Sequence, residues 1–203
     1  MERFQTLPVN ILPCDGEALY YGRIFDEVES SELESRLLHD IEWKNDEVKI
    51  FGKLHITKRK IAWYGDQEYS YSYSNTSRNA LPWTPDLLQL KSIIEKITQS
   101  TYNSCLLNLY HNGDEGVSWH SDNEKALGEE PAIASISLGA DRKFVFKHKS
   151  TKETIPILLE SGSLLLMKGK TQTNWLHSLP KSKKIDSMRI NLTFRTFFPP
   201  NKL

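Results

Sequence analysis

Three residues of metal-ligand type carry the most specific chemical information in this chain. His120 and Asp122 are two positions apart, so an extended segment turns both side chains to the same side, and His177 lies far downstream. Two imidazoles and one carboxylate can occupy one face of an octahedral metal ion and leave the other positions open, an arrangement that suits non-haem Fe(II) in oxygenases. The H-x-D spacing alone is a weak motif, but together with His177 and the stretch that follows it predicts a catalytic metal site.

A stretch shortly after His177 predicts a site for an acid. From Arg189 to Arg195, apolar and polar residues alternate as they do along a strand, so one face enters a core. The opposite face presents Arg189, Asn191, Thr193 and Arg195. Charged side chains are seldom buried without a partner, and guanidinium groups match carboxylates in bidentate geometry. We interpret this row as the binding site of a small carboxylic acid.

An upstream stretch repeats the same pattern. In residues 105–110, Asn108 and Tyr110 share one face of the predicted strand, while Leu107 and Leu109 share the other. Polar groups from two strands can therefore converge on one ligand.

Taken together, these residues resemble the AlkB family of iron- and 2-oxoglutarate-dependent dioxygenases, and especially its members that repair alkylated duplex DNA. The resemblance is carried by Asn108-x-Tyr110, His120-x-Asp122, His177 and Arg189-x-Asn191-Leu-Thr193-Phe-Arg195, and it runs from about residue 48 to 196. It implies Fe(II) at the three metal ligands and O2 as the oxidant. It also implies that 2-oxoglutarate binds to Asn108, Tyr110, Arg189, Asn191, Thr193 and Arg195, without assigning either arginine to a particular carboxylate.

The reaction implied by the resemblance removes a methyl group from a base nitrogen. 2-Oxoglutarate is decarboxylated to succinate and CO2 while the methyl group is hydroxylated, and the resulting hemiaminal releases formaldehyde and the unmodified base. A methyl group inside a duplex is not reachable, so such an enzyme must flip the nucleotide out of the stack.

An aromatic and basic segment, residues 50–73, suits this task, because rings stack on bases while Lys and Arg meet phosphates. The resemblance implies that Phe51, Gly52 and Lys53 belong to a hairpin finger that fills the gap left by the flipped base. For Trp63 and Tyr64 we expect packing on the core instead.

The resemblance also indicates which residues contact the extruded base. Tyr73, close to Tyr71, is expected to stack on it, and Glu124, next to Asn123, is expected near the base edge. Asn123 stands where an acidic residue is common in the family and Tyr73 where Phe is usual, which leaves the base preference open. As candidates for phosphate contacts we take Arg59, Arg142, Lys143 and Lys147.

The composition is that of a soluble globular protein. With 203 residues, 38% hydrophobic and 26% charged, the chain fits one domain, and its two cysteines agree with a reducing compartment. We find no signal peptide or membrane span, and expect a monomer in the cytoplasm, near the nucleoid in a prokaryote or in the nucleus of a eukaryote. Net charge is zero, but residues 143–184 hold nine Lys or Arg against two Glu, which is plausible for contact with phosphates.

The elements that must position these residues are helices first and strands later. Ser30 is predicted to cap a helix over 31–41, and a second helix should begin at Pro85, after Thr84, and run to about residue 99. From residue 103 onward short strands follow, predicted at 104–110, 132–138, 143–148, 154–159, 163–167, 174–177 and 189–197.

The fold class expected is α+β, mainly β. Short strands with turn signals favour a sandwich or barrel, and the resemblance implies a double-stranded β-helix, or jelly roll, supported by helices. Within one dioxygenase domain, 1–203, we expect an N-terminal helical extension over about 1–47, a nucleotide-recognition lid over 48–80, a supporting helix over 84–99 and a catalytic core over 103–198.

The predicted function is oxidative demethylation of 1-methyladenine and 3-methylcytosine in DNA, with duplex DNA favoured by the Phe51 finger. An RNA demethylase is the nearest alternative, because methyl lesions present the same base edge in both polymers. A small-molecule or protein hydroxylase is a second, since fold alone does not fix the substrate. A non-catalytic module that binds zinc or nothing is a third.

Overall fold

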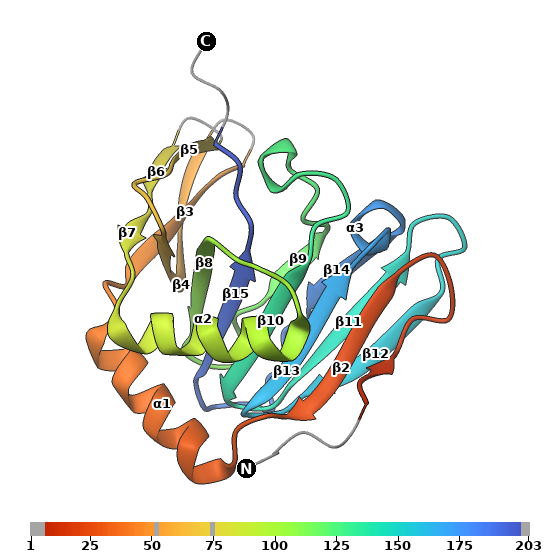
Figure 1. Ribbon diagram of the computed structural model, residues 1–203, viewed down its shortest axis with the longest axis horizontal. Helices are drawn as coiled ribbons and strands as arrows, with labels where there is room; N and C mark the ends of the chain where they lie inside the picture. Colours follow the sequence, from red (N-terminus) through yellow and green to blue (C-terminus); the bar gives the residue numbers. More distant parts are fainter. Residues whose placement is uncertain (1–6, 51–52, 74–75, 200–203) are drawn as a thin grey trace.

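The computed structural model describes residues 7–50, 53–73 and 76–199, and in the strands beside the two gaps, at 48–50, 53–55, 71–73 and 76–78, it describes the backbone alone. The described strands form a main sheet, a small sheet and a separate hairpin (Figure 1). The main sheet has the strand order β1-β2-β13-β10-β15-β8-β4-β3, with β7 beside β4, and the small sheet has the order β12-β11-β14-β9.

After residue 100, the seven strands that were predicted are all present, and their ends differ from the predicted ends by at most two residues. The main sheet consists of β1 (Val9–Asn10), β2 (Glu17–Arg23), β3 (Lys44–Ile50), β4 (Lys53–Gly65), β7 (Leu81–Pro82), β8 (Ser104–Tyr110), β10 (Ile133–Gly139), β13 (Ser163–Lys168) and β15 (Arg189–Arg195). The small sheet consists of β9 (Val117–His120), β11 (Arg142–His148), β12 (Thr154–Leu159) and β14 (Trp175–Leu179). The hairpin is β5 (Ser70–Tyr73) and β6 (Thr76–Asn79).

The two sheets face each other across a cavity, as in a jelly roll. Side chains from β8 and β15 of the main sheet and from β9 and β14 of the small sheet line the same hollow. Neighbouring strands within each sheet are antiparallel, apart from the short parallel contact of β7 with β4. The predicted mainly-β, jelly-roll fold class is therefore confirmed.

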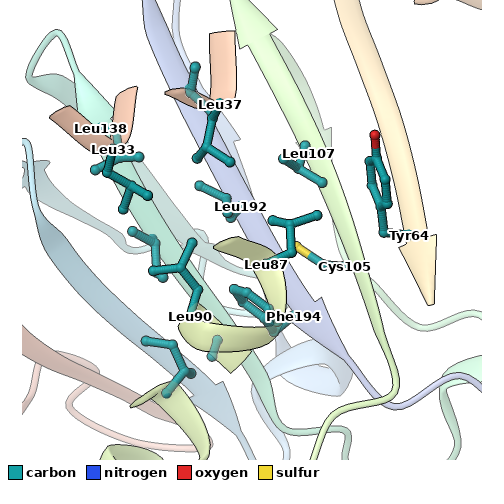
Figure 2. Packing of buried hydrophobic residues seen from close by; sticks show 14 of the residues in the cluster. Leu33, Leu37, Tyr64, Leu87, Leu90, Cys105, Leu107, Leu138, Leu192 and Phe194 are labelled. Carbon is teal, nitrogen blue, oxygen red and sulfur yellow. The ribbon is translucent and has the colours of Figure 1, made fainter. Parts of the chain in front are cut away.

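Two helices cover the outer face of the main sheet and complete its core. They are α1 (Glu27–Asp40) and α2 (Pro85–Thr98), and both lie across the same face of the sheet (Figure 1). Figure 2 shows their leucines gathered against strands β8, β10 and β15. Leu37 and Leu87 are almost fully buried there, and burial of each such side chain contributes about 1.5–3 kcal/mol. The packed helices thus cover the face of the main sheet that is turned away from the cavity.

The second helix begins as predicted, and the first does not. Thr84 caps α2 by accepting a hydrogen bond from the Leu87 N–H, with Pro85 in the first turn. The cap of α1 is Asp26, not Ser30. Asp26 and Glu29 form a capping box in which each side chain accepts a hydrogen bond from the other's backbone N–H. The helix therefore begins at Glu27, before Ser30.

The expected helical extension over 1–47 proves to contain part of the main sheet. Strand β2 pairs with β13 and places Leu19 and Tyr21 against the helix-side core, while Ala18 and Tyr20 face the core between the sheets. Both faces are thus covered, so the strand lacks the clean alternation of a half-exposed strand, which is why its pattern was not predicted.

The aromatic segment forms a ribbon that runs into the main sheet. Strand β3 pairs with β4 as far as Ile50 and Lys53, and the last six residues of β4 pair with β8. Tyr64 is buried, and Trp63 packs with Tyr69 and Phe197, as expected of core-facing residues. Trp63 also lines the cavity.

No helix within the described ranges is long and apolar enough to cross a membrane.

Candidate metal centre and acid-binding cavity

The three predicted metal ligands come together at the edge of the small sheet. His120 ends β9 and lies opposite His177 of β14, and Asp122 follows two residues later. Their ligand atoms all lie within 4.8 Å of one another. The two Nε2 atoms are 3.1 Å apart, and the Asp122 carboxylate is 3.9 Å from His120 Nε2 and 4.0 Å from His177 Nε2.

The protonation states of these groups fit a cation. The Nδ1 of His120 lies 2.8 Å from the Ser118 carbonyl, so Nδ1 carries the proton and Nε2 turns a lone pair to the cluster. Burial lowers the pKa of His177 to about 3, which keeps its imidazole neutral. Burial alone would raise the pKa of Asp122, but the neighbouring positive charge, Arg195 foremost, outweighs it and lowers that pKa. Two neutral imidazoles and an ionised carboxylate are the forms that bind metal.

A buried glutamine holds the Asp122 backbone in place. Gln172 lies on the short helix α3 (Thr171–Asn174), is 2% exposed, and its Oε1 accepts the Asp122 N–H at 2.8 Å. Lys149 donates to the Gln172 carbonyl at 2.8 Å and to Ser121 Oγ at 3.2 Å. These contacts tie the H-x-D segment to the helix that leads into β14, where the second imidazole lies.

Replacing Gln172 with leucine should therefore weaken metal binding. The substitution removes the acceptor for the Asp122 N–H, and loss of such an outer contact costs about 10- to 100-fold in metal affinity. We expect this loss in Mn(II) titrations followed by fluorescence. Thr173→Val is the matched control, since Thr173 is an exposed residue of the same helix. Equal affinities for Gln172→Leu and wild type would show that the ligands hold their geometry without this contact.

The predicted acid site lies on the main sheet beside the metal cluster. Asn191 of β15 pairs in register with Asn108 of β8, and its amide donates to Ser135 Oγ at 2.8 Å and to the Ile136 carbonyl at 2.9 Å. Thr193 Oγ1 donates to Asn191 Oδ1 at 3.2 Å. The side chains of Asn191 and Thr193 thus form hydrogen bonds within the protein. These bonds help to hold β15, which carries the two arginines, in position.

The two arginines of the row have different surroundings. Arg195 is 3.1 Å from the Asp122 carboxylate and so lies at the metal end of the cavity. Arg189 is 2% exposed, donates to Ser137 Oγ at 2.9 Å, and its guanidinium carbon lies 5.5 Å from the centre of the Tyr110 ring. Burial lowers the pKa of Arg189 to about 10, which leaves it charged near neutral pH. No carboxylate of the described residues pairs with it, so a buried cation faces the cavity.

The cavity joins these groups and has a volume of about 500 Å³. Its walls include all three metal ligands and all six residues predicted for the acid, namely Asn108, Tyr110, Arg189, Asn191, Thr193 and Arg195. The sequence-predicted metal and acid residues therefore share one hollow, large enough for a small diacid and part of a second substrate.

One predicted phosphate contact is corrected by the structure. Arg142 is 1% exposed, and its guanidinium donates to the carbonyls of Asn112, Glu115 and Pro180 at 3.4, 2.8 and 3.0 Å. It joins the loop before β9 to the end of β14. Sequence reasoning missed this role because the three acceptors are backbone carbonyls, which leave no signature in residue type.

The other basic candidates are placed differently from one another. The Arg59 side chain is 19% exposed, lines the cavity and forms an ion pair with Asp46. Lys143 is exposed and Lys147 half-buried on β11. Their contacts with DNA stay predictions.

Asp46 and Gln172 were not predicted as site residues, since neither stands in a recognisable motif.

The predicted base-contacting residues are only partly described. Glu124 and Asn123 line the cavity, and Glu124 Oε2 is buried without a hydrogen-bond partner among the described residues. Phe51 and Gly52 lie outside the described residues, as do the side chains of Lys53, Tyr71 and Tyr73.

Comparison with known proteins agrees with this site. The model of the 2OG-Fe(II) oxygenase superfamily matches residues 17–195. The chain is 36% identical over 202 residues to the Bos taurus protein named DNA oxidative demethylase ALKBH2, a match that covers 94% of this chain and 71% of that protein. It is 39% identical over 190 residues to the Homo sapiens protein named alpha-ketoglutarate-dependent dioxygenase alkB homolog 3, covering 89% and 66%.

A solved structure described as "The structure of OsALKBH1" has a TM-score of 0.62 to this chain at 14% identity, covering 91% of this chain and 99% of that one, and supports the fold. The protein is an oxidoreductase, and its cofactor and co-substrates are Fe(II), 2-oxoglutarate and O2. The superfamily match over residues 17–195 and the identity to both relatives show that this chain belongs to the AlkB family of 2OG-Fe(II) oxygenases.

Proposed function

We propose that this enzyme repairs alkylated DNA by oxidative demethylation, acting on 1-methyladenine and 3-methylcytosine. In this reaction one O2 and one 2-oxoglutarate are consumed, the methyl group leaves as formaldehyde, and succinate and CO2 are released. The observation that carries the proposal is the His120, Asp122 and His177 cluster beside a buried arginine in one cavity, in a chain similar to proteins named DNA oxidative demethylase.

The positions of the two arginines support an assignment of the acid's ends. Arg195 lies against the metal ligand Asp122, so the keto acid end of 2-oxoglutarate belongs there. Arg189 lies apart from the metal ligands against Tyr110, so the distal carboxylate belongs with it. Bidentate pairing of a guanidinium with that carboxylate then fixes the direction of the diacid.

The remaining part of the cavity suits a base. Trp63 and Phe144 supply apolar walls, and Glu124 Oε2, which has no hydrogen-bond partner among the described residues, is a ready acceptor for an exocyclic amine. Fe(II), when bound by the three ligands, supplies the activation of O2 that oxidises the methyl group. The chain's own contribution is to hold the methyl group close to the metal, to orient the diacid and to exclude water.

A direct assay tests the proposal. Purified protein with Fe(II), 2-oxoglutarate and an oligonucleotide containing 1-methyladenine or 3-methylcytosine should release formaldehyde and restore the unmodified base, as read by mass spectrometry. Competition among single-stranded DNA, duplex DNA and RNA carrying the same lesion gives the polymer preference. Succinate production without demethylation of any of these would refute the proposal and favour a hydroxylase of another substrate.

A further inference from the structure

The outer face of the small sheet carries an exposed tryptophan packed on a lysine. Trp119 of β9 is 42% exposed, and the ammonium of Lys147, from β11, lies 5.0 Å from the centre of its ring. This distance is typical of a cation–π contact. Strand β14 lies between β9 and β11, so the lysine reaches across it to meet the indole. The contact holds the ring in place and leaves part of it open to solvent.

The outward residues of β11 and β12 around this pair are basic or uncharged. Side chains alternate along β11 and β12, and because Phe144 and Phe146 face inward, Lys143, Val145 and Lys147 face outward, opposite Leu158, Pro156 and Thr154 of β12. Leu158 is 53% exposed. None of these outward positions carries an acidic residue. We call Trp119, Lys143, Val145, Lys147 and Leu158 the Trp119 face.

The Trp119 face lies next to the catalytic cavity. Trp119 directly precedes the metal ligand His120, and the two side chains leave β9 on opposite sides. Strand β9 is the edge strand of the small sheet. A nucleic-acid strand that leaves the cavity therefore has to cross only β9 before it reaches the indole of Trp119. A ligand that has one group in the cavity can therefore place its next group on this face.

We propose that the Trp119 face binds the single-stranded stretch of the nucleic acid that adjoins the target base, and this inference rests on the proposed function. A neighbouring base stacks on the indole of Trp119, while Lys143 and Lys147 meet the phosphates. An exposed aromatic ring beside lysines is the combination by which proteins hold single strands without reading their sequence. The lysines and the absence of acids on the outward positions of β11 and β12 favour an anionic partner over a cationic one.

Binding of an unmethylated single strand tests this inference without using catalysis. Wild type, Trp119→Ala and Trp119→Phe are titrated into a fluorescein-labelled 15-base oligonucleotide, and Kd is measured by anisotropy. Loss of one stacked base should raise Kd about 5- to 150-fold in Trp119→Ala, and Trp119→Phe should restore most of the affinity. Lys147→Ala should reduce the slope of log Kd against log salt by about 0.7. Leu88→Ala is the matched control, because Leu88 is 48% exposed on α2.

Each result decides the inference. Equal Kd for Trp119→Ala and wild type overturns it and leaves the face to a protein partner. A loss that Trp119→Phe fails to restore, together with a lower melting temperature, also overturns it, because the indole would then be structural. Failure of the proposed function shows separately, as the absence of formaldehyde release from methylated oligonucleotides by the wild type.

Discussion

Replacing Asp122 with alanine should reduce both demethylation and uncoupled succinate production to background. Asp122 is the anionic member of the ligand cluster, and its carboxylate lies within 4.0 Å of both histidine Nε2 atoms. Without it the two neutral imidazoles offer a divalent cation no compensating charge. Mn(II) titration should show the loss of the high-affinity site, and a formaldehyde assay the loss of turnover.

Two further variants make this result interpretable. Asp122→Asn keeps the side-chain shape and an oxygen acceptor for Arg195, so it separates loss of charge from loss of packing. Asp114→Ala removes an exposed aspartate from the preceding loop and should behave as wild type. Retained metal binding in a folded Asp122→Asn would place the metal elsewhere and contradict the proposed centre.

Replacing Arg189 with glutamine should weaken 2-oxoglutarate binding strongly. The guanidinium is buried and charged, and truncating one partner of a buried ion pair costs about 2–5 kcal/mol, which corresponds to about 30- to 5,000-fold in affinity. KM for 2-oxoglutarate should rise by this factor while Mn(II) affinity stays unchanged. Steady-state kinetics and Mn(II) titration measure the two quantities.

The charge and the shape of Arg189 can be separated. Arg189→Lys keeps a cation but loses the planar fork, so its KM should lie between those of wild type and Arg189→Gln. Arg36→Gln removes an arginine from an exposed ion pair with Asp86 and should leave KM unchanged. An unaltered KM in Arg189→Gln would mean that another residue receives the distal carboxylate.

The metal and acid residues could be predicted because local pattern and spacing define them. The alternation in 189–195 fixes which side chains share a face; the strand predicted over 189–197 is β15 and ends two residues earlier, at Arg195. Pro85 after Thr84 fixed the start of α2 in the same way. In both cases the residues that decide the structure are neighbours in the sequence.

The features that were missed depend on distant partners. Arg142 was predicted to contact phosphates, but it is buried, and three carbonyls from two distant loops accept its hydrogen bonds. Gln172 is buried against Asp122, 50 residues away. Strand β9 has only four residues at a sheet edge, too few for a clear period. Tertiary contacts decide each of these, and they leave no local signal.

The ion pair between Arg195 and Asp122 affects how binding of the metal ion and binding of 2-oxoglutarate depend on each other. Before loading, the guanidinium is occupied by the aspartate; a divalent cation that draws on the same carboxylate loosens that hold and frees the guanidinium for the incoming diacid. Iron and 2-oxoglutarate are therefore expected to bind with positive cooperativity, and by thermodynamic reciprocity each raises the affinity of the other by the same factor.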